Sequence, residues 1–315
     1  ETALNIGNRN EPALSIVICT FNRAELLKKT LGSLPSLTDI ESAEVIVVDN
    51  NSADHTRCVA MEFATACQGK FDVRYVFESR QGLSAARNAG AAAARGDIVA
   101  FLDDDAVPVR GWIRSIATAF GGGGRVHAMG GIVRPHFEGG RPEWLIKPME
   151  LPYTIVHLGD APIRYPANRH PCGANMAVRR WILLEFPFPE SLGRRGESLL
   201  SGEETWLFER MRERRMTIVY HPGMAVTHFI PAARLTREWI KRRYYCQGAS
   251  NGLAFLSRGQ RWKAFGSAAL RSAYVAVDSL FARSEGRKLL NECRRASIRG
   301  LLDQVRERGR VPAAG

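Results

Sequence analysis

The chain has 315 residues, of which 45% are hydrophobic, and its formal net charge is +12. This length and composition suit a globular protein with a sizeable core, either one large domain or a domain with an extension. Its 6 cysteines form no C-x-x-C pair, which argues against a disulfide framework and indicates reduced thiols. We find no basic-then-apolar leader and no uncharged apolar run of membrane-spanning length, so we expect a cytoplasmic protein.

Strand-like and helix-like segments alternate over roughly the first hundred residues. Short apolar runs are separated by segments that carry apolar residues at helical spacing, which predicts a parallel sheet flanked by helices. The sequence has no G-x-G-x-x-G after the first strand and no G-x-x-x-x-G-K-[ST], so a dinucleotide or P-loop site is disfavoured. The predicted strands are 14–20, 44–49, 73–77 and 98–102, and the predicted helices are 23–34, 54–66 and 83–94.

The second half of the chain is predicted to be less regular and then helical. Residues 121–170 are rich in Gly and Pro, which favours turns and loops. The predicted elements are a strand over 126–133, irregular structure over 134–170, a helix over 203–211, strands over 216–220 and 225–228, and helices after 231.

The excess basic charge lies in the last quarter of the chain. From residue 231 onward there are 18 Lys and Arg against 6 Asp and Glu, whereas residues 1–230 hold 26 of each class. This asymmetry predicts a domain over 1–230 and a basic helical extension over 231–315. It gives the extension a preference for anionic partners.

Three consecutive carboxylates, Asp103 to Asp105, follow the apolar run 98–102. Three like charges at the end of a buried strand repel one another, and a bound hard cation relieves that repulsion. In open α/β sheets the ligand crevice lies outside the carboxyl ends of the strands. The triplet therefore predicts a metal with phosphates in an active site, and a solvated acidic turn is the alternative.

Six motifs follow one another along the chain at a specific spacing. They are Ser15-Ile-Val-Ile-Cys-Thr-Phe-Asn-Arg23, Val47-Val-Asp-Asn-Asn-Ser52, Gly82-Leu-Ser-Ala-Ala-Arg-Asn-Ala-Gly90, Gly96-Asp-Ile-Val-Ala-Phe-Leu-Asp-Asp-Asp105, Cys172-Gly-Ala-Asn-Met-Ala-Val178 and Gly202-Glu-Glu-Thr-Trp-Leu207. Together they resemble the inverting glycosyltransferases of family 2 over roughly residues 12–230. The resemblance implies the GT-A nucleotide-diphospho-sugar transferase fold, a Rossmann-like, mainly parallel sheet flanked by helices.

The resemblance assigns the acidic triplet to the D-x-D motif of that family. It implies that Asp105 binds Mg²⁺ or Mn²⁺, and that Asp103 or Asp104 contacts the ribose or the metal. His228 follows a short strand and is implied as a further metal or diphosphate ligand, with a core histidine as an equal alternative.

The resemblance also implies a nucleotide pocket. Asp49 would hydrogen-bond the base, usually uracil, although an Asx turn at this position is compatible with that role. Arg87 would lie near the base and diphosphate, with a surface salt bridge as the alternative. Thr20 and Arg23 follow the first strand and are expected to line the same pocket.

A pair of glutamates is the expected source of the general base. Glu203 and Glu204 align with the Glu-Asp pair of the family, whose second member takes the proton of the acceptor hydroxyl, so Glu204 is preferred and Glu203 is held in reserve. The spacing from Ser201 to Glu204 also fits a capping box, which is the structural alternative. The acceptor is expected against Gly173, Ala174 and Asn175.

A helical apolar stripe runs through 262–282 in the basic extension. Arg271 and Asp278 argue against a membrane span. The stripe either packs on the catalytic domain, which is preferred, or lies in a membrane interface on the inner face of the membrane. Nucleic-acid binding is disfavoured, because no reader motif accompanies the charge.

The sequence therefore predicts a metal-dependent, inverting glycosyltransferase of polysaccharide biosynthesis. It would use a nucleotide-sugar, preferably a UDP-sugar, and a saccharide or lipid-linked acceptor. A sugar-phosphate nucleotidyltransferase is one alternative, but Thr20 to Arg23 replaces the Gly-rich loop that it needs. A non-catalytic saccharide- or nucleotide-binding module is the other.

Overall fold

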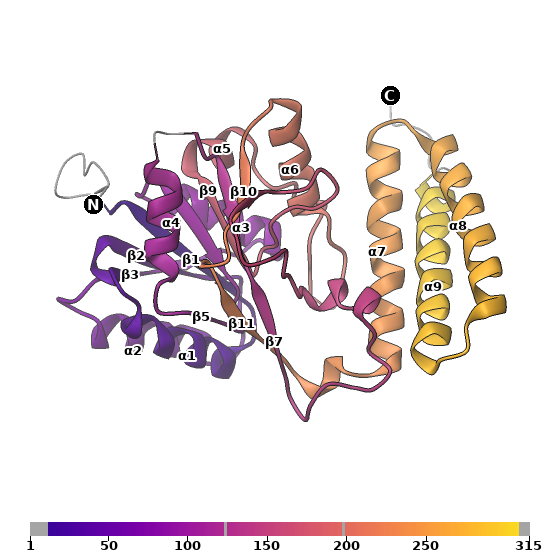
Figure 1. The fold of residues 1–315 in the computed structure, drawn as a ribbon. Helices are drawn as coiled ribbons and strands as arrows, with labels where there is room; N and C mark the ends of the chain where they lie inside the picture. Colours follow the sequence, from indigo (N-terminus) through magenta and orange to yellow (C-terminus); the bar gives the residue numbers. More distant parts are fainter. Residues whose placement is uncertain (1–11, 123–124, 197–198, 309–315) are drawn as a thin grey trace. The chain divides into compact units, whose positions relative to one another are not determined.

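In the computed structural model of the chain, residues 12–122, 125–196 and 199–308 are described (Figure 1). The chain divides into two compact units. The first unit contains the residues up to His136 together with Thr154–Ser191 and Glu203–Phe229. The second contains Phe137–Tyr153, Leu192–Gly202 and the chain from Ile230 onward, so two earlier segments join the predicted basic extension.

The first unit is built on a mixed sheet of 8 strands in the order β3-β2-β1-β4-β9-β6-β10-β8. Strands β3 to β4 of this order are all parallel, whereas β9 runs antiparallel to both β4 and β6. A second sheet has the order β5-β11-β7. The strands are β1 (Leu14–Thr20), β2 (Ala43–Asp49), β3 (Asp72–Phe77), β4 (Ile98–Leu102), β5 (Ala106–Pro108), β6 (Ala128–Gly130), β7 (Val133–Phe137), β8 (Ile163–Arg164), β9 (Asn175–Arg179), β10 (Ile218–Tyr220) and β11 (Val226–Ile230).

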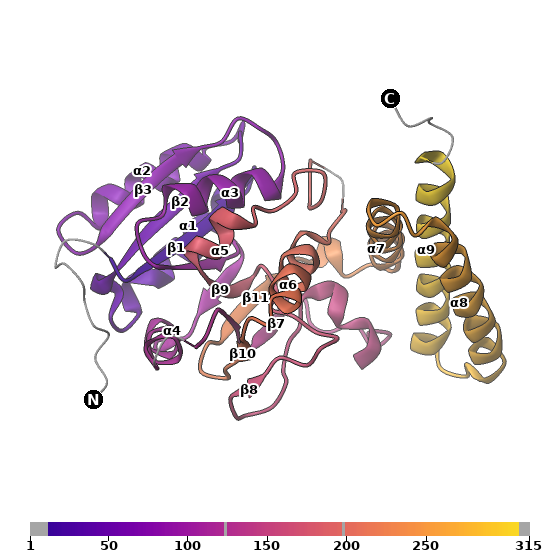
Figure 2. The same cartoon turned by 90° about the horizontal axis from the view of Figure 1, so that it is seen from above.

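The strand order fixes which face each helix covers. The connections from β1 to β2 and from β2 to β3 move in one direction across the sheet, and the connection from β3 to β4 moves back. Because parallel crossovers are right-handed, the first two helices lie on one face and the third lies on the other. The helices of this unit are α1 (Ala24–Ser33), α2 (Thr56–Ala66), α3 (Leu83–Ala93), α4 (Trp112–Gly121), α5 (Arg180–Glu185) and α6 (Glu203–Glu213) (Figure 2).

The predicted alternation of strands and helices is confirmed as far as β4, and later elements differ from the prediction. The single strand expected over 126–133 is wrong, because the chain forms β6, turns at Gly131 and then forms β7. A Cβ on Gly131 would lie 1.7 Å from the Met224 carbonyl oxygen, so only glycine allows this close approach. Helix α4, strand β9 and helix α5 were not predicted.

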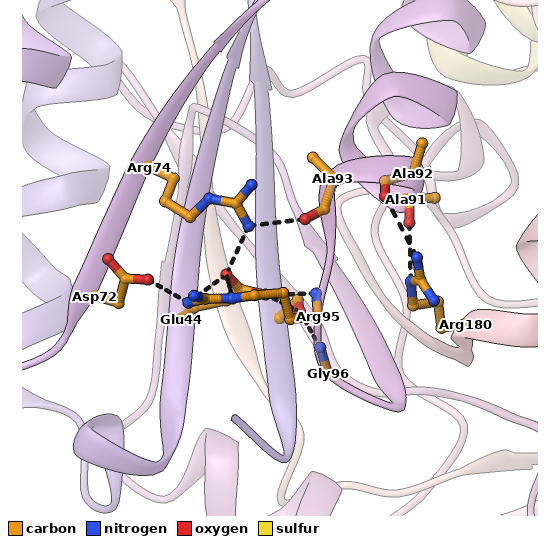
Figure 3. Close-up of polar contacts among 10 residues, drawn as sticks. Glu44, Asp72, Arg74, Ala91, Ala92, Ala93, Arg95, Gly96 and Arg180 are labelled. Carbon is orange, nitrogen blue, oxygen red and sulfur yellow. Dashed lines mark hydrogen bonds and ion pairs between the residues drawn. The ribbon is translucent and has the colours of Figure 1, made fainter. Parts of the chain in front are cut away.

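Charged side chains gather at the amino ends of β1 and β2 (Figure 3). The buried Glu44 carboxylate accepts hydrogen bonds from the Ser15 hydroxyl (2.7 Å), the Arg95 backbone N–H (2.7 Å) and the Arg74 guanidinium (3.0 Å). Arg95 also pairs with Asp72. A buried carboxylate is tolerated only with such partners, so this cluster ties the turn after α3 to the sheet.

The second unit contains a bundle of three long helices, which confirms the predicted C-terminal helical region. Helix α7 (Arg237–Ser257) packs closely on α9 (Glu285–Arg308), because a Cβ on Gly248 would lie 1.8 Å from the Ser297 carbonyl oxygen. Helix α8 (Arg261–Phe281) packs on α9 through Ala264, Ala268 and Val275. None of the described helices is both long and apolar enough to cross a membrane. The short helices of the chain are η1 (Leu34–Ser36), η2 (Ile40–Ser42), η3 (Lys147–Met149), η4 (Leu151–Tyr153) and η5 (Ala232–Arg234).

Candidate active site

The acidic triplet lies at the carboxyl end of β4, beside the end of β1. In the order β3-β2-β1-β4 the direction of the connections across the sheet reverses between β1 and β4, and such a switch point is where open α/β sheets bind ligands. The Thr20 hydroxyl, at the end of β1, donates a 2.8 Å hydrogen bond to Asp104 Oδ2. Thr20 is buried and thus supports Asp104 from inside the sheet.

Arg23 neutralises part of the triplet. Its Nη1 lies 3.0 Å from Asp104 Oδ1 and 3.1 Å from Asp105 Oδ2. Burial and the neighbouring Asp105 raise the pKa of Asp104, although Arg23 and Thr20 favour its charged form. Arg23 therefore contacts the carboxylates directly, and Asp104 has protein partners on both oxygens.

Asp103, Asp105 and His228 form a candidate metal site. Each offers one ligand atom, and these atoms all lie within 4.8 Å of one another. Strand β11 carries His228 to the triplet, where the Phe229 backbone N–H donates to the Asp105 carbonyl oxygen (2.8 Å) and His228 Nε2 lies 3.1 Å from Asp105 Oδ1. Two carboxylates and an imidazole are a donor set that Mn²⁺ or Mg²⁺ accepts, so these residues fit the ion implied by the sequence.

Asp49 lies at the carboxyl end of β2, next to β1 in the sheet. Its Oδ1 accepts the Ser52 backbone N–H (2.9 Å), which is the Asx turn that the sequence allows. Its Oδ2 accepts the Tyr75 hydroxyl (2.8 Å). Each carboxylate oxygen thus has a protein donor, and these two bonds fix its position at the sheet edge.

Arg87 joins α3 to the two glutamates of α6. Its Nη1 lies 2.9 Å from Glu203 Oε1 and 3.2 Å from Glu204 Oε1. The guanidinium also lies over the Phe101 and Phe188 rings. Because only 3% of the Arg87 side chain is exposed, the surface salt bridge considered for this residue is wrong.

The two glutamates differ in environment and therefore in protonation. Burial raises the pKa of Glu203, and the adjacent Glu204 raises it further. Burial would also raise the pKa of Glu204, but the charges of Arg87 and His170 outweigh it and lower that pKa. Glu203 lies nearer to Arg87 than Glu204 does. Glu204, however, accepts a second hydrogen bond from the Gly173 backbone N–H (3.2 Å) and is more exposed, and both features favour its ionised form.

Gly173 is required where the chain passes this ion pair. A Cβ at this position would lie 1.8 Å from Arg87 Nη2 and 2.8 Å from Glu204 Oε1. The Glu204 carboxylate thus contacts Gly173 and Arg87, and the Ser201 hydroxyl donates to Gln247 instead. The capping box considered for Ser201 and Glu204 is therefore wrong.

The segment proposed to meet the acceptor is partly internal. Ala174 and Asn175 are both buried. The Asn175 amide accepts from Trp112 Nε1 (2.9 Å) and donates to the carbonyl oxygens of Ile132 (3.0 Å) and Met224 (2.7 Å). The expectation that these two side chains face an acceptor needs correction, because both are buried, and of the three residues Gly173 is the one that contacts Glu204.

Sequence reasoning missed three residues around the site. Tyr75 binds Asp49, and Asn50 holds the loop before α3 by accepting the Gly82 N–H (2.7 Å). His170 Nε2 lies 3.0 Å from Thr205 Oγ1 and favours the charged form of Glu204. Neither Tyr75 nor His170 lies in one of the recognised motifs, so only the folded chain shows them.

The fold and these residues define a glycosyltransferase of the GT-A type. Comparison with known proteins agrees, since Glycosyl transferase family 2 matches residues 15–186, more than half of the chain. The chain belongs to this family. The nucleotidyltransferase and non-catalytic alternatives are therefore wrong.

Two curated relatives match over about three quarters of their own length. The glucosyl-dolichyl phosphate glucuronosyltransferase of Haloferax volcanii is 28% identical over 248 residues, 75% of each chain. The succinoglycan biosynthesis protein ExoM of Rhizobium meliloti is 31% identical over 242 residues, 76% of this chain and 74% of its own. Among solved structures, the mannosyltransferase PcManGT from Pyrobaculum calidifontis, in complex with GDP-Man and Mn²⁺, has a TM-score of 0.62 at 18% identity, covering 95% of this chain and 88% of its own. That likeness supports the fold.

Proposed function

We propose that the protein is a metal-dependent, inverting glycosyltransferase that moves a sugar from a UDP-sugar to an acceptor hydroxyl. The observation that supports this most strongly is the closeness of two chemical groups, the metal-ligand cluster and Glu204. Arg87 connects the two groups, because its Nη1 lies 3.2 Å from Glu204 Oε1 and its guanidinium lies over the ring of Phe101, on the strand that leads into Asp103.

The candidate ion site comprises Asp103, Asp105 and His228. A divalent ion held there would neutralise the charge of the leaving diphosphate. Arg23 adds a protein cation beside Asp104 and Asp105. Asp49, at the end of β2, is proposed to receive the base of the nucleotide.

Glu204 is proposed as the general base. Its carboxylate is ionised and 16% exposed, while Glu203 is nearly fully buried. In a single displacement the acceptor oxygen attacks the anomeric carbon, its proton passes to Glu204, and the bond to the diphosphate oxygen breaks. Arg87 and the Gly173 N–H hold the carboxylate in place.

The acceptor is proposed to be a saccharide or a lipid-linked saccharide. One relative acts on a glucosyl-dolichyl phosphate and another belongs to succinoglycan biosynthesis, according to their names. A solved structure with a similar fold, GalNAc-T7 with UDP, GalNAc and Mn²⁺, has a TM-score of 0.56 at 18% identity and spans 78% of this chain and 51% of its own. It supports the choice of a UDP-sugar.

A thermal-shift screen of UDP- and GDP-sugars with and without Mn²⁺ tests the donor, because a ligand that binds the folded state raises the unfolding temperature. Donor hydrolysis is then measured with the preferred sugar. We expect it to stop in excess chelator and in Asp105→Asn, whose unfolding temperature should stay close to that of the parent. Undiminished hydrolysis in chelator would remove the metal from the proposal.

A further inference from the structure

Helix α8 exposes a large apolar surface. Trp262 is 83% exposed, Leu270 76% and Leu280 81%, and three further large side chains of the helix are more than half exposed. Single exposed apolar residues are ordinary, but six on one helix are not. The remaining three are Tyr274, Val277 and Phe281.

These side chains form one continuous face. Leu270, Tyr274, Val277 and Leu280 follow one another at intervals of three or four residues. Phe281 lies four residues after Val277 and Trp262 lies eight residues before Leu270, which places all six on one side of the helix. The opposite side is buried against the bundle through Ala264, Ala268, Val275 and Asp278. The exposed side is called the α8 face below and comprises Trp262, Leu270, Tyr274, Val277, Leu280 and Phe281.

The exposed charges of α8 are all basic. Arg261, Lys263 and Arg271 are exposed. The one acidic residue of the helix, Asp278, is buried and pairs with Arg287 (2.6 Å) and Arg294 (3.3 Å). The helix therefore presents apolar and positive groups and no exposed carboxylate.

A hollow of about 300 Å³ opens beside the α8 face, between α7, α8 and α9. Leu270 and Tyr274 line its apolar side, and Arg271 and Arg294 line it with positive charge. The Arg294 guanidinium lies 4.9 Å from the centre of the Tyr274 ring. The hollow thus combines cations with apolar walls, as the α8 face does.

We propose that the α8 face docks the protein on the surface of a bilayer rich in anionic phospholipid, with α8 lying in the interface. Apolar side chains enter the boundary between headgroups and acyl chains, and flanking Lys and Arg attract anionic headgroups. Across two copies of the chain no exposed carboxylate of α8 would pair with Arg261, Lys263 and Arg271, so an anionic lipid surface matches the charge better. The inference does not depend on the proposed reaction.

Vesicle flotation tests this docking directly. The full chain is mixed with phosphatidylcholine vesicles, with or without phosphatidylglycerol, at low salt. We expect flotation only with phosphatidylglycerol, and at least a tenfold loss of binding in Leu270→Ser/Val277→Ser/Leu280→Ser. Met61→Ser/Leu151→Ser/Leu184→Ser removes exposed apolar residues elsewhere and should bind normally.

The contribution of the basic residues of α8 to vesicle binding is tested by a second variant and its matched control. Lys263→Glu/Arg271→Glu should lose binding, whereas Lys28→Glu/Lys70→Glu, with the same change in net charge at other exposed positions, should retain most of it. Donor hydrolysis should be the same in all these variants, which separates this proposal from the proposed reaction. Equal loss in both charge variants would mean that net charge alone attracts the protein, and would overturn the role of the α8 face.

Trp262 provides a local signal. Its fluorescence should shift to shorter wavelength and be quenched by brominated lipid, and Trp262→Phe should abolish that change. Absence of flotation with phosphatidylglycerol would overturn the proposal. So would a sedimentation result in which the parent is a dimer that the Leu270→Ser/Val277→Ser/Leu280→Ser variant dissociates.

Discussion

Arg87 and Glu204 form a 3.2 Å ion pair in which the side chains are 3% and 16% exposed, although 117 positions separate them in the sequence. The pair joins α3, the helix between β3 and β4, to α6, which carries the proposed base. Removing one partner of a buried pair leaves an uncompensated charge, so the pair makes the site and the fold depend on each other.

Replacing Arg87 should therefore destabilise the protein strongly. Arg87→Met is expected to lower the free energy of unfolding by about 3–5 kcal/mol, the usual cost of breaking a buried ion pair. Arg210→Met breaks an exposed pair with Glu213 and should cost less than about 1 kcal/mol. Urea unfolding curves of both variants measure the difference, and superimposable curves would contradict the account of Arg87.

The two glutamates should separate kinetically. Glu204→Gln keeps the shape of the side chain but cannot accept the proton, so kcat should fall by roughly 10²- to 10⁴-fold while donor binding is nearly retained. Glu203→Gln preserves a neutral side chain at a position where burial favours the neutral form, and should lose far less activity. Steady-state kinetics with donor titrations measure both, and the reverse ranking would assign the base to Glu203.

Gly173 should not tolerate a side chain. Gly173→Ala places a Cβ against Arg87 and Glu204, so we expect a loss of roughly 1–3 kcal/mol in unfolding free energy and a clear fall in kcat. Gly32→Ala is the control, because nothing lies within 4 Å of its Cβ and it lies within α1. Alanine there should stabilise the protein by about 0.5–1 kcal/mol. Normal activity in Gly173→Ala would show that the site has more room.

Many strands and helices in the first half of the chain could be predicted, because each is marked by a pattern within its own residues. The apolar runs that form β1, β2 and β4 are buried along their whole length, so their composition alone marks them. Strand β9 was missed because its Asn175 looked like a site residue. Its amide is in fact bonded to three partners far away in the sequence, and no local pattern shows such a role.

The candidate site, like the fold, could be predicted from the sequence only in part. The motifs predicted roles for Asp105 and Glu204, the position after a short strand predicted a role for His228, and the structure brings Asp105 and His228 together. The motifs could not show that Thr20 holds Asp104, or that Arg87 binds both glutamates, since these contacts span 84, 116 and 117 positions. The long apolar stripe of α8 was expected to pack inward, but periodicity reports a face and not what covers it.

The Glu44 cluster should make stability depend on pH. Burial would raise the pKa of Glu44, but hydrogen bonds from Ser15, Arg95 and Arg74 outweigh it and hold the pKa below its ordinary value of 4.5. The stabilising contribution is thus present above pH 4.5 and is lost as pH falls through the lower, folded-state pKa. Glu44→Gln should flatten the dependence of unfolding free energy on pH below 4.5. An unchanged slope, equal to that of the exposed control Glu25→Gln, would contradict this.

The proposal of inverting transfer is tested most directly by the anomer that is first released when the enzyme hydrolyses an α-linked UDP-sugar. Proton NMR recorded within the first minutes, before mutarotation, distinguishes the two forms. A single displacement, with Glu204 accepting the proton of the attacking water, predicts that the β-anomer appears first and that Glu204→Gln slows its appearance. Initial release of the α-anomer would contradict the account.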